Sequence, residues 1–460
     1  MNYDEGSFRD PAGKVFYHLN KVYRQINISG QVRIKFLEEK NLIRKAQENN
    51  FLVNSKILNP DEVQHLGFDK DSLIIEHEKI PYISYPYEWS FSQLKSAALH
   101  HLDFHLFLLE NNATLIDASA YNIQFIGANP KFIDILSIKE YEDGEYWYGH
   151  KPFCENFLNP LILSAKKGIQ FNKWFKGNLE GIPTDELNNI LTFFDKFSYN
   201  IFVHVYLLNK FDNKYKNQNK KVNISLKKKF PKKNLVSMLT QLRNFIKGLK
   251  QKKIKTVWEN YSTVNTYKKS EENEKAEIVK NFIDGNILPR VIDLGCNDGF
   301  YSKIAMRNNI NYVVGFDYDS ISIDRAFNSF GDKQKNFLPL IFDATNPSAN
   351  IGWNELERKS FNKRANFDGL LALAFEHHLA IAKNIPLKDT VNWLVSLAPK
   401  GLIEFVPKND ETIQKMLKFK GDIFPDYSED NFKKYIEEEA RIISIKEVTS
   451  SGRKIYQYEK

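Results

Sequence analysis

The chain has 460 residues, of which 42% are hydrophobic and 14% aromatic, and this length predicts two or three domains with hydrophobic cores. Two cysteines are too few for a disulfide framework, which excludes the disulfide-rich secreted class and favours a reducing, cytoplasmic setting. No apolar signal region follows Met1 and no apolar run is long enough to cross a bilayer, so we expect a soluble protein.

The first part of the chain reads as a mixture of strands and helices. Residues 14–20 and 21–26 alternate polar with β-branched or aromatic residues and predict a β-hairpin. A helix is expected at about residues 31–47 and a further strand at 74–80. An aromatic extended segment then leads into a long helix at 91–111.

Three polar residues with a recognisable spacing lie in the segment after this long helix. Asp117 and Asn122 have the D-x-x-x-x-N spacing of the base and a metal ligand in kinases, and Asp134 ends a predicted hairpin where a magnesium-binding aspartate would stand. The segment thus resembles the catalytic loop of kinase-like and small-molecule phosphotransferase folds. The resemblance implies an α+β kinase-like domain at residues 1–209, with Asp117 as base, Asn122 and Asp134 as magnesium ligands, and ATP as cosubstrate.

The same segment departs from the kinase pattern. Leu115 replaces the motif's histidine, Ile-Leu replaces Phe-Gly after Asp134, and no glycine-rich loop is visible near the N-terminus. Arg24 is a candidate for the phosphate-anchoring lysine, with Glu38 or Glu39 as its partner. Retained phosphotransfer and a catalytically silent scaffold both stay open, as does a structural role in which the polar residues only cap a loop.

A basic segment at residues 210–255 predicts the main domain boundary. It contains 15 lysines, one arginine and one aspartate, and such a block marks a connector or an interaction surface. A solvated linker helix and docking on an anionic membrane are both open, whereas the lack of an RNP motif disfavours nucleic acid. One amphipathic helix is expected from apolar residues at helical spacing, namely Leu235, Leu239, Leu242, Ile246 and Leu249.

The region after the connector begins with a helical stretch and then a glycine turn. Residues 257–283 are either a lid bearing Tyr261 and Tyr267 or a core-packing helix. An apolar strand then ends in Asp293, and the following turn also carries an acid, Asp298. Carboxylates repel the pyrophosphate of a dinucleotide. They suit a nucleoside with cationic groups, and S-adenosylmethionine has an ammonium and a sulfonium.

Further acids follow later strands, where an open α/β sheet presents its ligand-binding groups. Asp317 ends the second predicted strand, 24 residues after Asp293, at the spacing of a ribose-binding acid. Asp343 ends the third strand, in position to meet an adenine edge. The predicted second to fifth strands and the final antiparallel pair span residues 312–316, 338–342, 367–374, 401–406, 440–448 and 453–458.

The motifs D-L-G-C-N-D-G-F, G-F-D-Y-D and F-D-A resemble those of class I S-adenosylmethionine-dependent methyltransferases over about residues 255–460. The resemblance implies a methyltransferase domain at 256–460, with a Rossmann-like α/β sheet of seven strands, the last antiparallel. A NAD-binding domain, or an α/β domain in which Asp293 caps a helix, is the alternative. The resemblance to methyltransferases implies ten residues that contact the cofactor, namely Asp293, Gly295, Cys296, Asn297, Gly299, Asp317, Tyr318, Asp343, Ala344 and Leu373.

Candidate catalytic residues follow the fourth predicted strand. Methylation of a hydroxyl needs a base, and His377 and His378 stand at the edge where chemistry occurs in open sheets. Glu376 and Glu404 are candidate orienters, and at least one of the histidines is expected to be structural. The Asn-Pro-Pro-Tyr type of motif is absent here, which disfavours methylation of DNA or glutamine.

The run Leu-Ala-Leu-Ala-Phe-Glu-His-His-Leu, joined to a kinase-like half, resembles methyltransferases that modify polysaccharides and nodulation factors. This resemblance implies O-methylation of a glycan or related small molecule. A bifunctional kinase and methyltransferase, and an interaction scaffold whose kinase-like half recruits a partner, are the alternatives. No oligomeric state is indicated.

Overall fold

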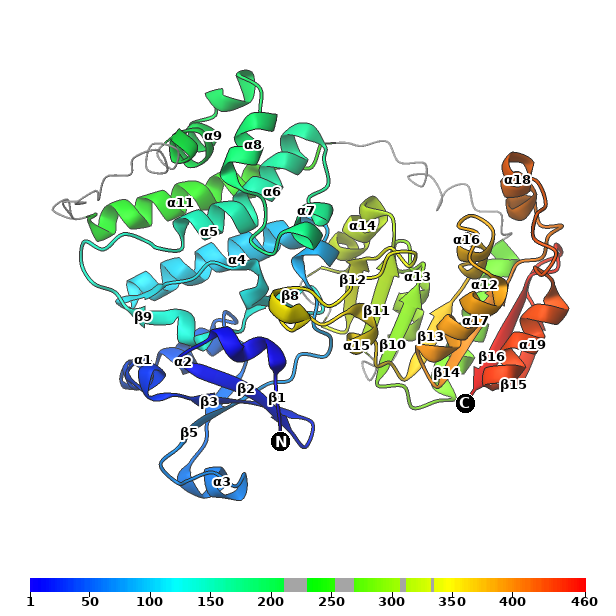
Figure 1. The fold of residues 1–460 in the computed structure, drawn as a ribbon, viewed down its shortest axis with the longest axis horizontal. Helices are drawn as coiled ribbons and strands as arrows, with labels where there is room; N and C mark the ends of the chain where they lie inside the picture. The colour runs from blue at the N-terminus through cyan, green and yellow to red at the C-terminus, as the bar shows by residue number, and fades with distance from the viewer. Residues whose placement is uncertain (211–229, 253–268, 307–311, 332–334) are drawn as a thin grey trace. The chain divides into compact units, whose positions relative to one another are not determined.

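The computed structural model describes residues 1–210, 230–252, 269–306, 312–331 and 335–460 (Figure 1). The chain forms two compact units. The N-terminal unit comprises Met1–Phe125, Pro130–Ile254 and Asn350–Arg358, and the C-terminal unit comprises Ile126–Asn129, Lys255–Ala349 and Lys359–Lys460. Each unit therefore includes a short segment taken from the other half of the sequence.

A five-stranded sheet begins the N-terminal unit, in the order β1-β2-β3-β5-β4. The predicted hairpin is confirmed, because β2 and β3 pair antiparallel. Leu19 and Asn20 between them have φ values of 47° and 63°, as a tight two-residue hairpin turn requires. The strands are β1 (Asn2–Tyr3), β2 (Gly13–His18), β3 (Lys21–Ile26), β4 (Ser55–Ile57) and β5 (Leu73–His77).

The helix expected at 31–47 is in fact two helices, α1 (Ile28–Glu39) and α2 (Leu42–Glu48). The break is at Asn41, whose φ of 52° lies in the left-handed region that an α-helix cannot contain. A further short helix, α3 (Pro60–His65), precedes β5.

The long helix α4 (Phe91–Glu110) is the centre of the helical part of this unit. It begins at a capping box made by Ser90 and Gln93. The amphipathic helix of the basic segment, α11 (Lys232–Gly248), packs against α4 through its buried apolar side chains, and Arg243 pairs with Asp103. This helix, for which a solvated linker and docking on an anionic membrane were both open, is part of the N-terminal unit. Residues 211–229 and 253–255 of the basic segment lie outside the described residues.

Short elements complete the N-terminal unit. The predicted hairpin after Asn122 is present as β7 and β8. The elements are β6 (Ala113–Leu115), β7 (Ile123–Ile126), β8 (Asn129–Phe132), β9 (Ile138–Glu140), α5 (His150–Phe153), α6 (Asn159–Ile162), α7 (Asn172–Gly177), α8 (Thr184–Ile190) and α9 (Tyr199–Ile201), with π-helical stretches at Cys154–Leu158, Leu163–Lys167 and Phe202–Leu207.

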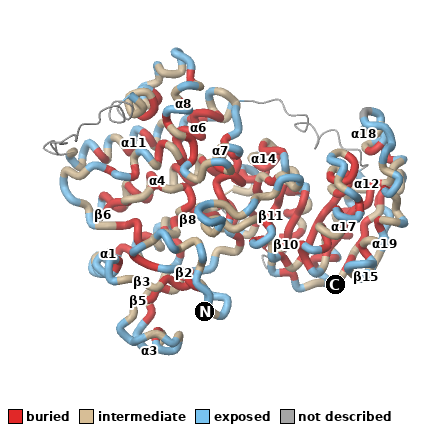
Figure 2. Tube along the Cα trace, viewed as in Figure 1, coloured by how far each residue is buried: buried red, intermediate tan, exposed pale blue. Residues whose placement is uncertain are grey.

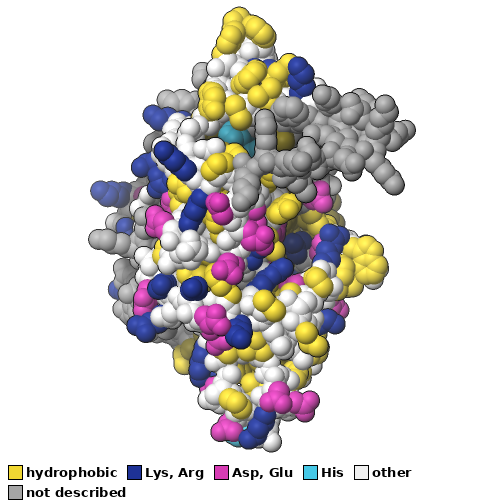
Figure 3. Space-filling view, turned by 90° about the vertical axis from the view of Figure 1, so that its left-hand side faces the viewer, with side chains coloured by type: hydrophobic (Ala, Val, Ile, Leu, Met, Phe, Trp, Pro, Cys, Tyr) yellow, Lys and Arg dark blue, Asp and Glu magenta, His cyan; other side chains and the backbone are white. Residues whose placement is uncertain are grey.

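Exposed aromatic rings gather between α8 and α9. Phe193, Phe194 and Phe197 contact one another and are 72%, 81% and 71% exposed. Figure 3 shows hydrophobic side chains at this end of the N-terminal unit, at the top of the view. This end therefore presents apolar surface to its surroundings.

The C-terminal unit is built on a seven-stranded sheet in the order β12-β11-β10-β13-β14-β16-β15. The first five strands in that order are parallel, and β16 pairs antiparallel with β14 and β15. Figure 2 shows that the central strands are buried. The predicted mixed α/β class is confirmed. The strands are β10 (Arg290–Leu294), β11 (Tyr312–Asp317), β12 (Phe337–Ile341), β13 (Gly369–Ala372), β14 (Lys400–Phe405), β15 (Arg441–Glu447) and β16 (Lys454–Glu459).

Helices pack on this sheet and connect its parallel strands (Figure 1). Tyr261 and Tyr267 of the expected lid lie outside the described residues, and the helix that follows them begins at Lys269. None of the helices in the described residues is long and apolar enough to span a membrane. The helices are α12 (Lys269–Asp284), α13 (Phe300–Ala305), α14 (Ser320–Phe330), α15 (Phe361–Arg364), α16 (Glu376–Ala380), α17 (Leu387–Ser396), α18 (Glu411–Lys420) and α19 (Glu429–Glu439).

The segments exchanged between the two halves of the sequence were not predicted. The tip of the β7–β8 hairpin belongs to the C-terminal unit, where the backbone N–H of Gly127 donates to the Tyr312 hydroxyl at 3.1 Å. Asn350–Arg358 belongs to the N-terminal unit, where the Arg358 guanidinium lies 4.3 Å from the centre of the Tyr121 ring.

Candidate functional site

The turn after β10 has a backbone that only a few residue types can adopt. Gly295, Asn297 and Gly299 have φ values of 75°, 50° and 86°, all in the left-handed region. A Cβ atom at Gly295 would also lie 3.1 Å from the Phe375 ring. The two predicted glycines are thus needed for conformation, and the first of them lets the turn approach the segment that follows β13.

Asp317, at the end of β11, holds this turn. Its two carboxylate oxygens accept the backbone N–H groups of Asn297 at 2.9 Å and Asp319 at 2.8 Å. A carboxylate has about four lone-pair sites, so Asp317 can still accept from a further donor. Burial raises the pKa of Asp317 to about 6, against the lowering effect of hydrogen bonds from the backbone of Asp319, Asn297 and Tyr318.

Asp293, in β10, is a second buried acid beside the turn. It accepts a hydrogen bond from the Ser302 hydroxyl at 2.6 Å. Burial raises the pKa of Asp293 to about 6, and the charge of Asp317 contributes to the increase. Two carboxyl groups with raised pKa values stand together at one sheet edge, and a positively charged ligand would stabilise both in the ionised form.

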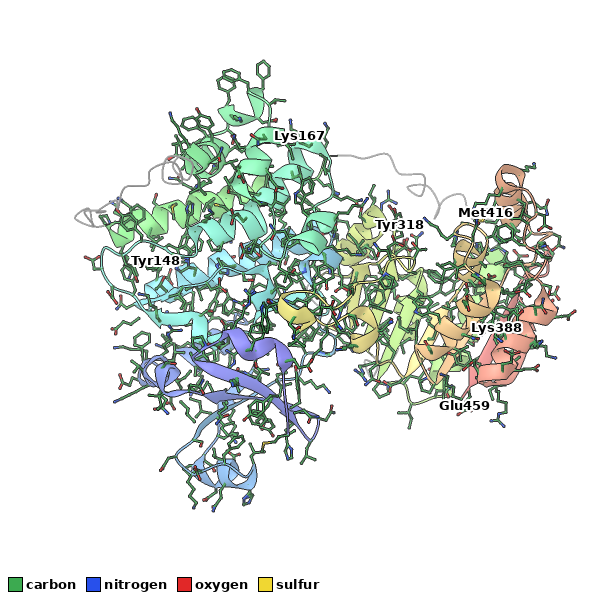
Figure 4. All side chains as sticks on the ribbon, in the orientation of Figure 1. Tyr148, Lys167, Tyr318, Lys388, Met416 and Glu459 are labelled. Carbon is green, nitrogen blue, oxygen red and sulfur yellow. The ribbon has the colours of Figure 1, made fainter. Side chains whose placement is uncertain are left out.

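The other predicted cofactor residues lie at the ends of the parallel strands. The register pairs Leu294 with Phe316 and with Ala372, so the segments that follow β10, β11 and β13 share one edge. Asp343 follows β12 and accepts from both the backbone N–H and the hydroxyl of Thr345. Cys296 and Leu373 are buried, Ala344 is half-buried and Tyr318 projects from the end of β11 (Figure 4).

The predicted orienting acids, Glu376 and Glu404, both have partners at other positions in the unit. Glu376 accepts hydrogen bonds from the backbone N–H of Val406 at 3.0 Å and from the Tyr427 hydroxyl at 2.8 Å, and not from a histidine. Glu404 forms an ion pair of 2.6 Å with Lys275, with both side chains buried. The expectation that Glu376 orients a histidine through a hydrogen bond is therefore wrong.

The two histidines stand side by side after β13, with ring centres 4.2 Å apart. His377 is buried, and in the described residues neither of its ring nitrogens has a hydrogen-bond partner. Burial holds the pKa of His377 well below its usual range and lowers the pKa of the half-buried His378 to about 4. Both imidazoles are therefore neutral at pH 7, the form that accepts a proton.

The three polar residues of the N-terminal unit gather in one place. Asn122 donates from its side-chain amide to Asp117 at 2.8 Å. The backbone N–H of Ile133 donates to the Asn122 carbonyl at 2.9 Å, which holds the residue before Asp134 against Asn122. Burial raises the pKa of Asp117, and the charge of Asp134 raises it further. Because no donor among the described residues reaches the Asn122 side-chain oxygen, that oxygen is available as a ligand.

Arg24, in β3, supplies the positive charge at this group. Its guanidinium donates to Asp134 at 2.6 Å and lies 3.7 Å from Asp10, so the expected pairing with Glu38 or Glu39 is wrong. Burial acts to raise the pKa of Asp134, but Arg24 and the hydrogen bond from the Ser137 hydroxyl hold it below its ordinary value.

The nodulation protein NoeA of Rhizobium meliloti (strain 1021) is 41% identical to this chain over 457 residues, which cover 99% of this chain and 95% of that protein. The chain belongs to the NoeA family. No protein-family model matches it.

Solved structures resemble a part of the chain. One is WbdD, with 16% identity, a TM-score of 0.31 and coverage of 44% of this chain and 43% of that chain. Another is an rRNA methylase from Escherichia coli, with 17% identity, a TM-score of 0.27 and coverage of 41% and 65%. A third is the N-methyltransferase NodS from Bradyrhizobium japonicum WM9, with 7% identity, a TM-score of 0.30 and coverage of 42% and 97%.

Two residues of this site in the NoeA-family chain were missed in the sequence. Lys275 lies on the apolar face of α12, beside Ile278 and Val279, where a buried lysine requires a buried acid. A lysine on an apolar helix face could therefore have been recognised in the sequence as half of a buried ion pair. Tyr427 offered none, because its partner Glu376 is 51 residues earlier in the sequence.

The buried Glu376 predicts a pH dependence of stability. Burial raises the pKa of Glu376 to about 8, from an unfolded-state value of about 4.5. The protonated carboxyl therefore adds to the free energy of unfolding in full below about pH 4.5, and this stabilisation is lost as pH rises through 8. Glu376→Gln should flatten the fall in stability between these pH values, by up to about 1.4 kcal/mol per pH unit. Urea unfolding across this range measures the difference, with exposed Glu411→Gln as the control. Parallel curves for wild type and Glu376→Gln would contradict the assignment.

Proposed function

We propose that the C-terminal unit is an S-adenosylmethionine-dependent methyltransferase acting on a hydroxyl of a glycan or related small molecule. The observation that carries the proposal is the pair of buried acids, Asp293 and Asp317, around a left-handed glycine turn at the carboxyl edge of the sheet. Raised pKa values at both acids favour a ligand with positive charge over one with a pyrophosphate.

The residues at this edge fit the parts of such a cofactor. The close approach allowed at Gly295 and Gly299 suits the methionine moiety, beside Asp293. The free lone pairs of Asp317 suit the ribose hydroxyls, and Asp343 suits the adenine. When bound, the cofactor supplies an electrophilic methyl group on its sulfonium.

The histidines supply the acid–base chemistry in this proposal. A ring nitrogen of a neutral imidazole would accept the proton of the acceptor hydroxyl. His378 is the more accessible, whereas His377 has two unpartnered ring nitrogens. Hydrogen bonds from Val406 and Tyr427 hold Glu376, which begins the helix that carries both rings.

The substrate class rests on the family and on residue motifs. The relative with 41% identity is a nodulation protein, which favours an acceptor made during nodulation. Charge on the basic segment further suggests an anionic membrane as partner, because its described helix α11 is flanked by lysines.

Asp317→Asn should weaken binding of S-adenosylmethionine by about 10- to 100-fold, since it removes a charge-assisted bond worth roughly 1.5 to 3 kcal/mol. Isothermal titration calorimetry measures this loss, and Asp284→Asn, an exposed acid at the end of α12, is the control. Thermal unfolding shows whether the variant keeps its turn, because Asp317 also accepts two backbone N–H groups. Unchanged affinity would remove Asp317 from the site.

Replacing the catalytic base should lower turnover and leave cofactor binding intact. We expect His377→Ala or His378→Ala to reduce turnover about 10²- to 10⁴-fold on a hydroxyl acceptor, because general-base catalysis contributes that much. A screen of glycan acceptors with labelled cofactor measures turnover, and calorimetry measures binding. Full activity in both variants would exclude the histidines as the base.

A second activity, phosphotransfer by the N-terminal unit, is favoured by the gathering of Asp117, Asn122 and Asp134 beside Arg24. Carboxylate and amide oxygens suit magnesium, and a guanidinium suits phosphate. In this proposal Asn122 and Asp134 hold the metal and Asp117 is the base. The alternative is an interaction scaffold, in which the Arg24–Asp134 pair only joins the sheet to the hairpin.

Magnesium-dependent ATP binding distinguishes these alternatives. The wild type should bind ATP only with magnesium, and Asp134→Asn should abolish binding because it removes the charge of a metal ligand. Asp143→Asn, in an exposed turn, is the matched control. A wild type that does not bind ATP with magnesium is the result expected of the scaffold.

A further inference from the structure

A separate group of side chains in the N-terminal unit brings three metal-ligating atoms together. His150 and His204 approach to 2.9 Å, between Nε2 of the first and Nδ1 of the second. Cys154 Sγ lies 3.7 Å from the same Nε2 atom of His150. All three ligand atoms lie within 4.8 Å of one another. None of these residues belongs to either site described above.

The local backbone directs these side chains to one point. His150 and Cys154 are four residues apart on successive helical turns, so they share a helix face. Cys154 begins the π-helical stretch Cys154–Leu158, and His204 lies in the π-helical stretch Phe202–Leu207. π-helical turns are rare and occur often at functional sites. Two of the three ligands therefore stand on an uncommon backbone conformation.

A hydrogen bond at Nε2 of His150 can engage only one of its two neighbours at a time. Cys154 is fully buried and His204 is 3% exposed. In a neutral imidazole, Nε2 of His150 either carries a proton and donates, or carries a lone pair and accepts. It therefore cannot donate to Nδ1 of His204 and accept from the Cys154 thiol at the same time. A metal ion would engage the lone pairs of all three atoms at once.

We propose that His150, Cys154 and His204 form a binding site for Zn²⁺, with a fourth position open to water or another ligand. Zinc binds imidazole nitrogen at about 2.0–2.1 Å and thiolate sulfur at about 2.3 Å, so tetrahedral ligand atoms are about 3.3 to 3.6 Å apart. The sulfur–nitrogen distance of 3.7 Å is close to this spacing. The nitrogen–nitrogen distance of 2.9 Å has to open by a few tenths of an ångström.

The protonation states of the three ligands define the binding reaction. A neutral imidazole binds a metal through its unprotonated ring nitrogen, and a cysteine binds it as the thiolate. Zinc binding breaks the S–H bond, forms the Zn–S bond and releases one proton to solvent. No oxidant or reductant takes part.

Metal content and Co²⁺ spectroscopy of the full-length protein test the site. After removal of metal with a chelator, the wild type should take up one Zn²⁺ per chain by elemental analysis. Co²⁺, used as a spectroscopic substitute, should give a thiolate-to-cobalt charge-transfer band in the near ultraviolet and intense visible bands of a four-coordinate ion.

Variants assign the ligands. Cys154→Ser should lose the charge-transfer band, and His204→Gln should lower Zn²⁺ affinity about tenfold or more. Cys296→Ser, which changes the other cysteine of the chain, should keep both the band and the metal. Circular dichroism checks that each variant is folded. A wild type that binds no Zn²⁺ at micromolar concentration would overturn the proposal, as would a band that persists in Cys154→Ser and disappears in Cys296→Ser.

Discussion

The carboxylate of Asp317 is the constraint on which the candidate cofactor site depends. It joins the exit of β11 to the glycine turn after β10 through two backbone N–H groups, one from each segment. If this carboxylate were removed, the backbone N–H of Asn297 in the left-handed turn would lose the acceptor that holds the turn in place. A single buried acid thus sets the shape of the edge and also contributes its charge.

Buried charge is distributed along this edge in two ways. Lys275 neutralises Glu404 directly, and its ammonium group lies 4.9 Å from the centre of the Tyr301 ring. Asp293, Asp317 and Glu376 instead have raised pKa values, because burial costs their ionised forms more than their hydrogen bonds return. The binding of a cation would change the protonation of these acids.

Local patterns in the sequence predicted much of this fold, because they depend on neighbouring residues. Apolar runs located the strands, and an acid at or near the end of each of the first three strands of the seven-stranded sheet located its carboxyl edge. Pairs that are distant in the sequence were not predictable. Lys275 and Glu404, Arg24 and Asp134, and Gly127 and Tyr312 all meet only after folding. The helix break at Asn41 was missed, although the step of five residues from Leu37 to Leu42 interrupts the helical spacing of the buried positions.

The exchanged segments affect how the chain can be divided. Among the described residues, the chain passes between the two units at residues 125/126, 129/130, 349/350 and 358/359. A protease cut within 253–268 would therefore leave each product without a segment that the other carries. The same holds for gene truncation: a C-terminal fragment lacks the hairpin tip that donates to Tyr312, and an N-terminal fragment lacks the Arg358 that covers Tyr121. A cut between the two halves of the sequence therefore does not yield two complete units.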